Sequence, residues 1–185
     1  MNFASELLKA SMDLADGKSY KTLTRHHEDI LQAFYRSLNA EQRRMRFGAA
    51  VSDDSIARYC EQIDWRSTLV IAYGAAFRPD AVALNVRIDD RRVENATVAT
   101  RSGDDAVPML LRLSALGARD FFAADRMLVN LDGASWLLRH LRQIGSTIVN
   151  EDFAEFNLSS MAGEVAEIDS RARSRPTEVR AASCG

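Results

Sequence analysis

The chain has 185 residues, of which 46% are hydrophobic and 27% are charged, as in a soluble globular domain with an ordinary core. A net charge of −2 gives no overall attraction to polyanions, so we expect neither nucleic acid nor a membrane surface as a partner. Of the 24 Lys and Arg residues, 21 are Arg, which we attribute first to a bacterial gene of high G+C content and only second to a functional preference.

The cysteines and histidines predict a reduced cytoplasmic protein without a metal. Cys60 and Cys184 are too few and too far apart for a disulfide framework or a metal site. The three histidines show no metal-ligand spacing and are expected at the surface: His26, His27 and His140. Residues 1–18 lack the continuous apolar core of a signal peptide, and no apolar run approaches the length of a membrane span.

Hydrophobic periodicity predicts a chain that contains both helices and strands. Helical spacing of apolar residues predicts helices at residues 3–14, 29–38, 40–45, 53–62, 106–121 and 134–144. β-branched or alternating apolar residues predict strands at residues 19–24, 68–73, 82–88, 92–99 and 125–131, and a terminal strand over 147–158 that is interrupted or turns near residue 151. Residues 89–91 join two of these strands into a hairpin.

Several residues predict where the helices begin and end. Asn39 suits the N-cap of the helix predicted at residues 40–45, and either Ser52 or Asp53 suits the N-cap of the helix predicted at residues 53–62. The basic residues near residue 45 could form an anion patch, but we favour a solvated last turn, in which positive charge suits the helix dipole. These residues are Arg43, Arg44 and Arg46. The patterns divide the chain into a helical extension (1–18), one domain (19–160) and a flexible tail (161–185).

Three segments, in this order and at this spacing, resemble the GNAT superfamily of acyl-CoA N-acyltransferases, in particular the GNAT domains of protein-lysine acetyltransferases. They are LNAEQRRMRFG with the following SDDSIARYC (38–60), VENATVATRSGDDAVPMLLRLSALGARD (93–120) and WLLRHLRQIGSTI (136–148). The resemblance implies an α+β fold with a central mixed, mostly antiparallel sheet flanked by helices. It also implies that acyl-CoA, such as acetyl-CoA, binds beside the central strand and reacts with an amine.

In the family, free amides of the central strand hold acyl-CoA, and its pyrophosphate lies on a loop of pattern Gln/Arg-x-x-Gly-x-Gly/Ala at the next helix. The corresponding strand residues are Val98, Ala99 and Thr100, and the corresponding loop residues are Ser102, Gly103, Asp104, Asp105 and Ala106. When the motif is aligned on Leu110 and Leu111, Ser102 takes its first position, Asp105 its fourth and Val107 its sixth. A shift by one residue brings Ala106 to the last position but still places no Gly at the fourth.

The two aspartates argue against tight binding of a phosphate. The helix dipole gains about 0.3–1 kcal/mol for an anion. A carboxylate about 4 Å from a phosphate charge costs roughly 4 kcal/mol at an effective dielectric near 20. An Asp at the N-cap would also occupy the amides that the phosphate needs. This loop therefore has the position of a phosphate loop and the chemistry of a helix cap, unless the carboxylates point away or Arg101 neutralises one.

The family also implies catalytic positions. Glu94 corresponds to a strand glutamate that acts as general base in some members, although an exposed strand carboxylate is the favoured alternative. Leu141 occupies the position of a tyrosine that protonates the leaving thiolate. Asn130 does not match the family's asparagine and is expected to end a strand.

Two functions remain open at this point. One is a divergent N-acetyltransferase with weakened or absent catalysis, acting on an amine of a small molecule or of a protein lysine. The other is a noncatalytic GNAT-fold regulatory or binding protein that does not use acyl-CoA. Fold alone does not separate them. The sequence also leaves a homodimer open.

Overall fold

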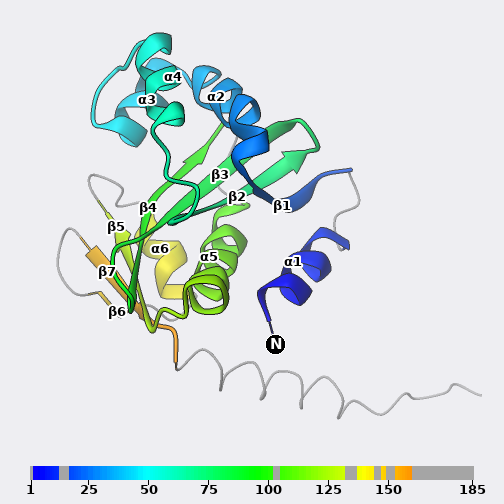
Figure 1. Cartoon of the computed structure of the whole chain (residues 1–185), viewed down its shortest axis with the longest axis vertical. Coiled ribbons are helices and arrows are strands. Elements are labelled where there is room, and N and C mark those ends of the chain that lie inside the picture. Colours follow the sequence, from blue (N-terminus) through cyan, green and yellow to red (C-terminus); the bar gives the residue numbers. More distant parts are fainter. Residues whose placement is uncertain are drawn as a thin grey trace, which may run out of the picture.

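The structure is a computed structural model that describes residues 2–12, 17–101, 105–131, 137–143, 147–148 and 153–159 (Figure 1). Its helices are α1 (Phe3–Met12), the 3₁₀-helix η1 (Arg25–His27), α2 (Glu28–Arg36), α3 (Ala40–Phe47), α4 (Asp53–Glu61), α5 (Val107–Phe122) and α6 (Leu137–Gln143). Its strands are β1 (Ser19–Leu23), β2 (Thr68–Ala75), β3 (Arg78–Arg87), β4 (Arg92–Thr100), β5 (Arg126–Asn130), β6 (Thr147–Ile148) and β7 (Phe153–Asn157).

The strands form one seven-stranded mixed sheet in the order β1-β2-β3-β4-β5-β7-β6. Only β4 and β5 run parallel; the other described pairs are antiparallel, which confirms the predicted mixed, mostly antiparallel sheet. The predicted terminal strand consists of β6 and β7, which pair antiparallel. Because these two strands are antiparallel, the chain reverses direction between Ile148 and Phe153. Of the two predicted alternatives, an interruption or a turn, the turn is therefore correct.

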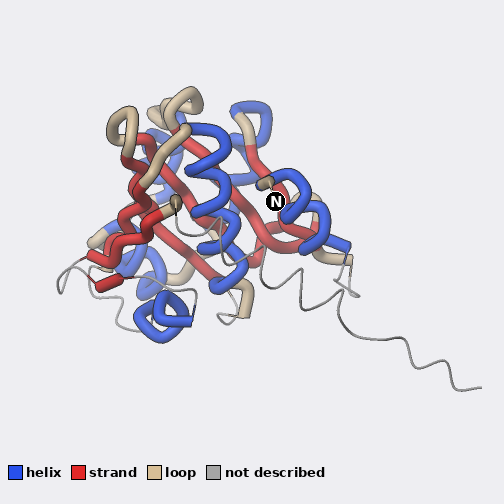
Figure 2. Tube along the Cα trace, turned by 90° about the horizontal axis from the view of Figure 1, so that it is seen from below, coloured by secondary structure: helices blue, strands red, loops and turns tan. Residues whose placement is uncertain are grey.

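Helices cover both faces of the sheet. Figure 1 shows α2, α3 and α4 on one side and α1, α5 and α6 on the other, and Figure 2 shows α5 lying across the strands. Strand β2 is apolar on both faces because each face meets a helix layer. Alternate residues separate into an α5-side core, which includes Leu69 and Ile71, and an α2-side core, which includes Val70 and Ala72. The leucines on the sheet-facing sides of α5 and α6 are buried or partly buried in the α5-side core: Leu110, Leu113, Leu137, Leu138 and Leu141.

The N-terminal helix α1 is fastened to α5. The Phe3 amide donates to Asp120 Oδ2 at 2.6 Å, and the rings of Phe3 and Phe121 lie 5.2 Å apart, edge to face. Glu6, which is buried, pairs with Arg112 at 3.6 Å. The extension thus covers part of the α5-side core.

The predicted solvated turn near residue 45 is wrong for Arg43 and Arg46, whereas Arg44 is exposed, as predicted. The Arg46 Cζ atom lies 4.6 Å from the centroid of the Phe47 ring and 5.0 Å from that of Tyr59. Arg43 donates from Nε to Leu38 O and from Nη1 to Val51 O, both at 3.0 Å. Cation–π contacts therefore hold the Arg46 side chain, and hydrogen bonds to two backbone carbonyls hold the Arg43 side chain.

The N-caps of α3 and α4 agree with the predictions from the local sequence. The side chain of Asn39 accepts from the Gln42 amide, and that of Ser52 accepts from the Ser55 amide, so Ser52 rather than Asp53 is the N-cap. Asn130 ends β5, as expected. The predicted tail (161–185) lies outside the described residues.

Candidate functional site

Strands β4 and β5 are paired at one end and diverge at the other. Their parallel ladder runs from Arg92 with Arg126 to Asn95 with Val129. Strand β4 continues to Thr100, which is still paired with β3 at Ala81. From Ala96 onward, the β5-side edge of β4 therefore has no strand partner among the described residues. A register shift in the β3–β4 ladder falls at the same level, between Leu84 and Asn85, and marks a bulge.

The closed end of the two strands is held by polar contacts. The amides of Asp125 and Arg126 donate to Arg91 O at 3.0 and 3.1 Å. The Arg91 guanidinium also bonds the Asp125 carboxylate, with Nε 2.7 Å from Oδ2. The hairpin between β3 and β4 is thus tied to the start of β5, so the divergence opens toward the N-terminus of α5.

The side chains beside the divergence lie on both faces of the sheet. Val98 belongs to the α5-side core and Ala99 to the α2-side core. Glu94 lies one residue before the last β4–β5 pair, opposite Val86, which packs against the α2-side core. Glu94 is partly buried and has no ion pair or hydrogen bond with any described residue. It is therefore not the fully exposed strand carboxylate that the sequence favoured.

Among the described residues, no side chain caps the N-terminus of α5. Its N-cap is Ala106, which has no side chain that could cap the helix, and Asp105 is exposed. Pro108 has no N–H, and the amides of Val107 and Met109 have no hydrogen-bond partner in the described part of the chain. The prediction that an Asp at the N-cap occupies these donors is therefore wrong for Asp105. Ser102, Gly103 and Asp104 lie outside the described residues.

The position of the N-cap bears on the two predicted registers of the loop motif, which stay predictions. With Ala106 at the N-cap, a six-residue loop that ends where the helix begins spans residues 101–106. Arg101 then takes the first position, where the family has Gln or Arg, and Ala106 takes the last. Asp104 takes the fourth position, where the family has Gly.

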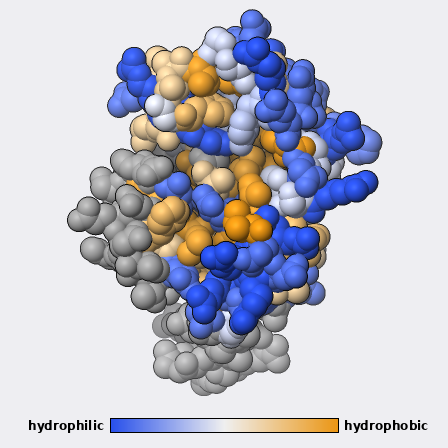
Figure 3. All heavy atoms as spheres, turned by 60° about the vertical axis from the view of Figure 1, so that its left-hand side comes forward, coloured by the Kyte–Doolittle hydropathy of each residue, from blue (hydrophilic) through white to orange (hydrophobic). Residues whose placement is uncertain are grey.

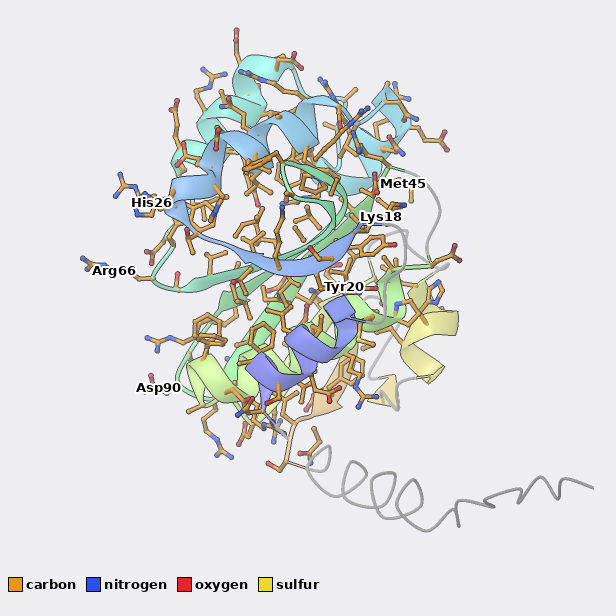
Figure 4. All side chains as sticks on the ribbon, turned by 90° about the vertical axis from the view of Figure 1, so that its right-hand side faces the viewer. Lys18, Tyr20, His26, Met45, Arg66 and Asp90 are labelled. Atoms are coloured by element: carbon orange, nitrogen blue, oxygen red, sulfur yellow. The ribbon has the colours of Figure 1, made fainter. Side chains whose placement is uncertain are left out.

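Arg101 is engaged in an ion network at the end of β4. Its Nη2 lies 2.9 Å from Asp80 Oδ1, and its amide donates to Asp80 O at 2.8 Å. Lys18 Nζ lies 3.5 Å from Asp80 Oδ2. Figure 4 shows Lys18 and Tyr20 at the start of β1. Arg101 therefore has a carboxylate partner other than the loop aspartates.

Gln42 and Asp80, which no sequence motif indicated, fix this end of β4. Gln42 donates from Nε2 to Thr100 O at 3.0 Å and to Arg101 O at 3.3 Å. Its Oε1 accepts from the Asn39 amide at 2.9 Å, so the capping box of α3 also holds the strand end. The Asn-x-x-Gln spacing could have indicated the capping box. Nothing in the sequence indicates that Asp80 meets Arg101, because 21 positions separate them.

Helix α6 differs from the prediction at one position. His140, expected at the surface, is only 7% exposed, because it shares a helix face with the core residues Leu137 and Leu141. Leu141 is fully buried, so an apolar core side chain fills the position of the family's tyrosine. Within the described ranges no group of three or more His, Cys, Asp or Glu side chains is arranged to bind a metal, and no helix is long and apolar enough to cross a membrane.

Figure 3 views the side of the molecule that carries β4, β5 and β7, and shows hydrophobic side chains gathered near its centre with polar side chains around them.

Comparisons with known proteins identify the fold. No protein-family model matches the chain, and no curated protein sequence matches it. The chain is similar to the solved GNAT domain of PAT from S. lividans, with 16% identity and a TM-score of 0.54 over 76% of this chain and 90% of that one. It is also similar to spermidine N-acetyltransferase from Vibrio cholerae, solved with CoA and spermine, with 9% identity and a TM-score of 0.56 over 77% and 96%.

A third solved structure with this fold is an aminoglycoside 6′-acetyltransferase of type Ii, with 11% identity and a TM-score of 0.56 over 75% of this chain and 96% of that one. These likenesses show that the chain has the GNAT acyltransferase fold, as the sequence motifs predicted. At such low identities they do not extend to substrate or activity.

Proposed function

We propose that this protein is an N-acyltransferase of the GNAT type that transfers an acyl group from acyl-CoA to an amine. The observation that carries the proposal is the divergence of β4 from β5. Beyond Asn95 the edge of β4 has no strand partner among the described residues, and β4 leads to the N-terminus of α5, which no described side chain caps. Backbone donors along a strand and at a helix end suit an amide-containing chain that ends in a phosphate.

The residues present fit acyl-CoA at the strand and at the helix end. The amides of Val98 and Thr100, which alternate with that of Ala99 and point away from β3, would hold the pantetheine portion. Those of Val107 and Met109 would hold the pyrophosphate together with the Gly103 loop. When bound, acyl-CoA supplies a thioester carbonyl as the electrophile. Ala106 at the N-cap has no polar side chain that would compete with the ligand for the helix amides.

Glu94 is the proposed general base. Its position beside the last β4–β5 pair, on the α2 side, suits an amine that approaches from that face. Glu94 accepts the proton that the amine nitrogen loses as the new C–N bond forms and the C–S bond breaks. The departing sulfur keeps the bonding electron pair and takes a proton from solvent, since Leu141 has no proton to give. The amide and free CoA are the products, and Glu94 returns its proton to water.

We further propose that binding and catalysis are weaker than in typical members of the fold. Asp105 and Asp104 add negative charge where the pyrophosphate would lie, and Arg101 is already paired with Asp80. Absence of a tyrosine at position 141 would slow departure of the thiolate. The same observations favour the second candidate, a binding or regulatory protein without acyl-transfer activity.

Calorimetry of the full chain with CoA and acetyl-CoA, followed by assays of thiol release with polyamine and lysine-peptide acceptors, tests the proposal. We expect a dissociation constant in the high micromolar range and slow release of CoA. Glu94→Gln should slow turnover without changing acetyl-CoA affinity, whereas Glu155→Gln, a matched strand carboxylate on β7, should leave turnover unchanged. If neither CoA nor acetyl-CoA binds at millimolar concentrations, the noncatalytic function is the correct one.

A further inference from the structure

The side chain of Gln42 joins the start of α3 to the end of β4. Its Nε2 group donates to Thr100 O at 3.0 Å and to Arg101 O at 3.3 Å, so both hydrogens of the carboxamide are used by backbone carbonyls. Its Oε1 accepts from the Asn39 amide at 2.9 Å, and the Asn39 side chain accepts from the Gln42 amide at the same distance. This capping box fixes which end of the carboxamide faces β4, because the Asn39 amide can only donate.

One of the two carbonyls lies on the edge of β4 that has no strand partner among the described residues. In an antiparallel ladder, successive residues direct their N–H and C=O groups alternately toward the neighbouring strand and away from it. The Arg101 amide donates to Asp80 O, so the N–H and C=O groups of Thr100 point away from β3. The Gln42 carboxamide therefore lies at the same edge as the Thr100 amide, beyond Asn95, where the β4–β5 ladder ends.

These hydrogen bonds fix the direction in which the chain leaves β4. Gln42 holds the oxygen of the peptide group between Thr100 and Arg101, and Asp80 O holds the N–H of the same group. The second bond from Gln42 holds the carbonyl of the next peptide group, that of Arg101. The N-cap of α5 follows only five residues later, at Ala106. The orientation of these two peptide groups thus sets the start of the segment that connects the strand edge to the helix.

We propose that Gln42 is a positioning residue for acyl-CoA, which holds the end of β4 so that the Thr100 amide and the N-terminus of α5 serve the same ligand. This inference rests on the proposed function, since it concerns the backbone donors that would bind acyl-CoA. Both donors of Gln42 are used by the protein, so Gln42 acts through the backbone of β4. Donors that are held in place before binding give higher affinity than donors that must be ordered by the ligand.

Two variants that lack the donor test the inference. Gln42→Glu keeps an acceptor for the Asn39 amide, and therefore the capping box, but has no N–H to offer to β4. Gln42→Met has a similar length and removes the donor without adding charge. In calorimetry at high salt, where the charge of the glutamate is screened, we expect each variant to bind acetyl-CoA about tenfold more weakly, the effect of one or two hydrogen bonds. In thiol-release assays the KM for acetyl-CoA should rise while the KM for the amine stays unchanged.

Asn39→Ala is the matched control, because it breaks the other half of the capping box and leaves both donors of Gln42 in place. It should lower the melting temperature by about 2–4 °C and change the affinity for acetyl-CoA less than about threefold. A loss of affinity in Asn39→Ala equal to that in the Gln42 variants would overturn the inference, because the stability of α3 would then be the cause.

Unchanged affinity in the Gln42 variants would also overturn the inference and would leave the proposed function standing. Failure of the unaltered protein to bind CoA or acetyl-CoA would instead refute the proposed function, and the inference with it. If Gln42→Met does not fold, Gln42→Glu, which keeps the helix cap, decides.

Discussion

Gly117 of α5 lies against Leu69 of β2 so closely that a Cβ atom at position 117 would lie 2.3 Å from Leu69 Cδ2. The same Cβ would lie 3.4 Å from the Phe3 ring of α1. The glycine therefore sets how closely α5 approaches the sheet and leaves room for α1. Since α5 also presents its N-terminus to the divergence of β4 and β5, this contact positions the candidate site.

We expect Gly117→Ala to destabilise the fold. Alanine favours a helix by about 1 kcal/mol over glycine, but overpacking a core costs about 1–3 kcal/mol. The free energy of unfolding in urea should therefore fall by up to about 2 kcal/mol. In a Leu69→Ala background the methyl group has space, so adding Gly117→Ala should be neutral or stabilising. Equal effects in both backgrounds would contradict the proposed clash.

The loop aspartates are expected to weaken acyl-CoA binding through their charge. Asp104→Asn with Asp105→Asn removes two negative charges and should strengthen acetyl-CoA binding at least about tenfold at low salt, and less at high salt because of screening. Calorimetry at two ionic strengths measures this. Asp54→Asn with Asp90→Asn, a matched pair of exposed aspartates elsewhere, should have little effect. Tight binding by the unaltered protein would mean that the carboxylates turn away from the phosphate.

Cys60 is expected to be unreactive in the native protein. It is fully buried, and burial raises the pKa of its thiol to about 11. Little thiolate is present at pH near 8, and reagents do not reach it. In a Cys184→Ser variant, a thiol reagent such as DTNB should label Cys60 only as fast as the protein unfolds. Rapid labelling without denaturant would show that the α2-side core opens readily.

Two buried tyrosines predict a loss of stability at alkaline pH. Burial raises the pKa values of Tyr35 and Tyr20 to about 12, above the unfolded value of about 10. The folded state therefore holds these protons more tightly, and their effect on stability is constant below pH about 10. Between pH about 10 and 12 the unfolding free energy should fall by about 1.4 kcal/mol per unit for each tyrosine.

Urea titrations at several pH values measure this slope, and Tyr35→Phe should reduce it by about half. Absorbance of tyrosinate near 295 nm, followed in parallel, should show these two residues titrating only as the protein unfolds. A slope that Tyr35→Phe does not change would mean that other groups cause the alkaline transition.

The sequence determined the order of elements, the fold and the caps at Asn39 and Ser52. These features depend on residues within a few positions of one another. The spacing of apolar residues determines whether a segment forms a helix or a strand, and the side-chain oxygen of an N-cap accepts from an amide in the first turn of its helix. It also predicted a phosphate loop before α5, which stays a prediction. Glu94, Val98 and Thr100 were identified from the same motifs, although their roles stay predictions.

Only the tertiary structure decided what surrounds these residues. Arg101 meets Asp80, and Arg46 lies against the rings of Tyr35 and Tyr59, because distant segments pack together. His140 is buried because its helix face turns to the core. Burial and pairing arise from contacts between residues far apart in the chain, whereas periodicity records only how each segment folds locally.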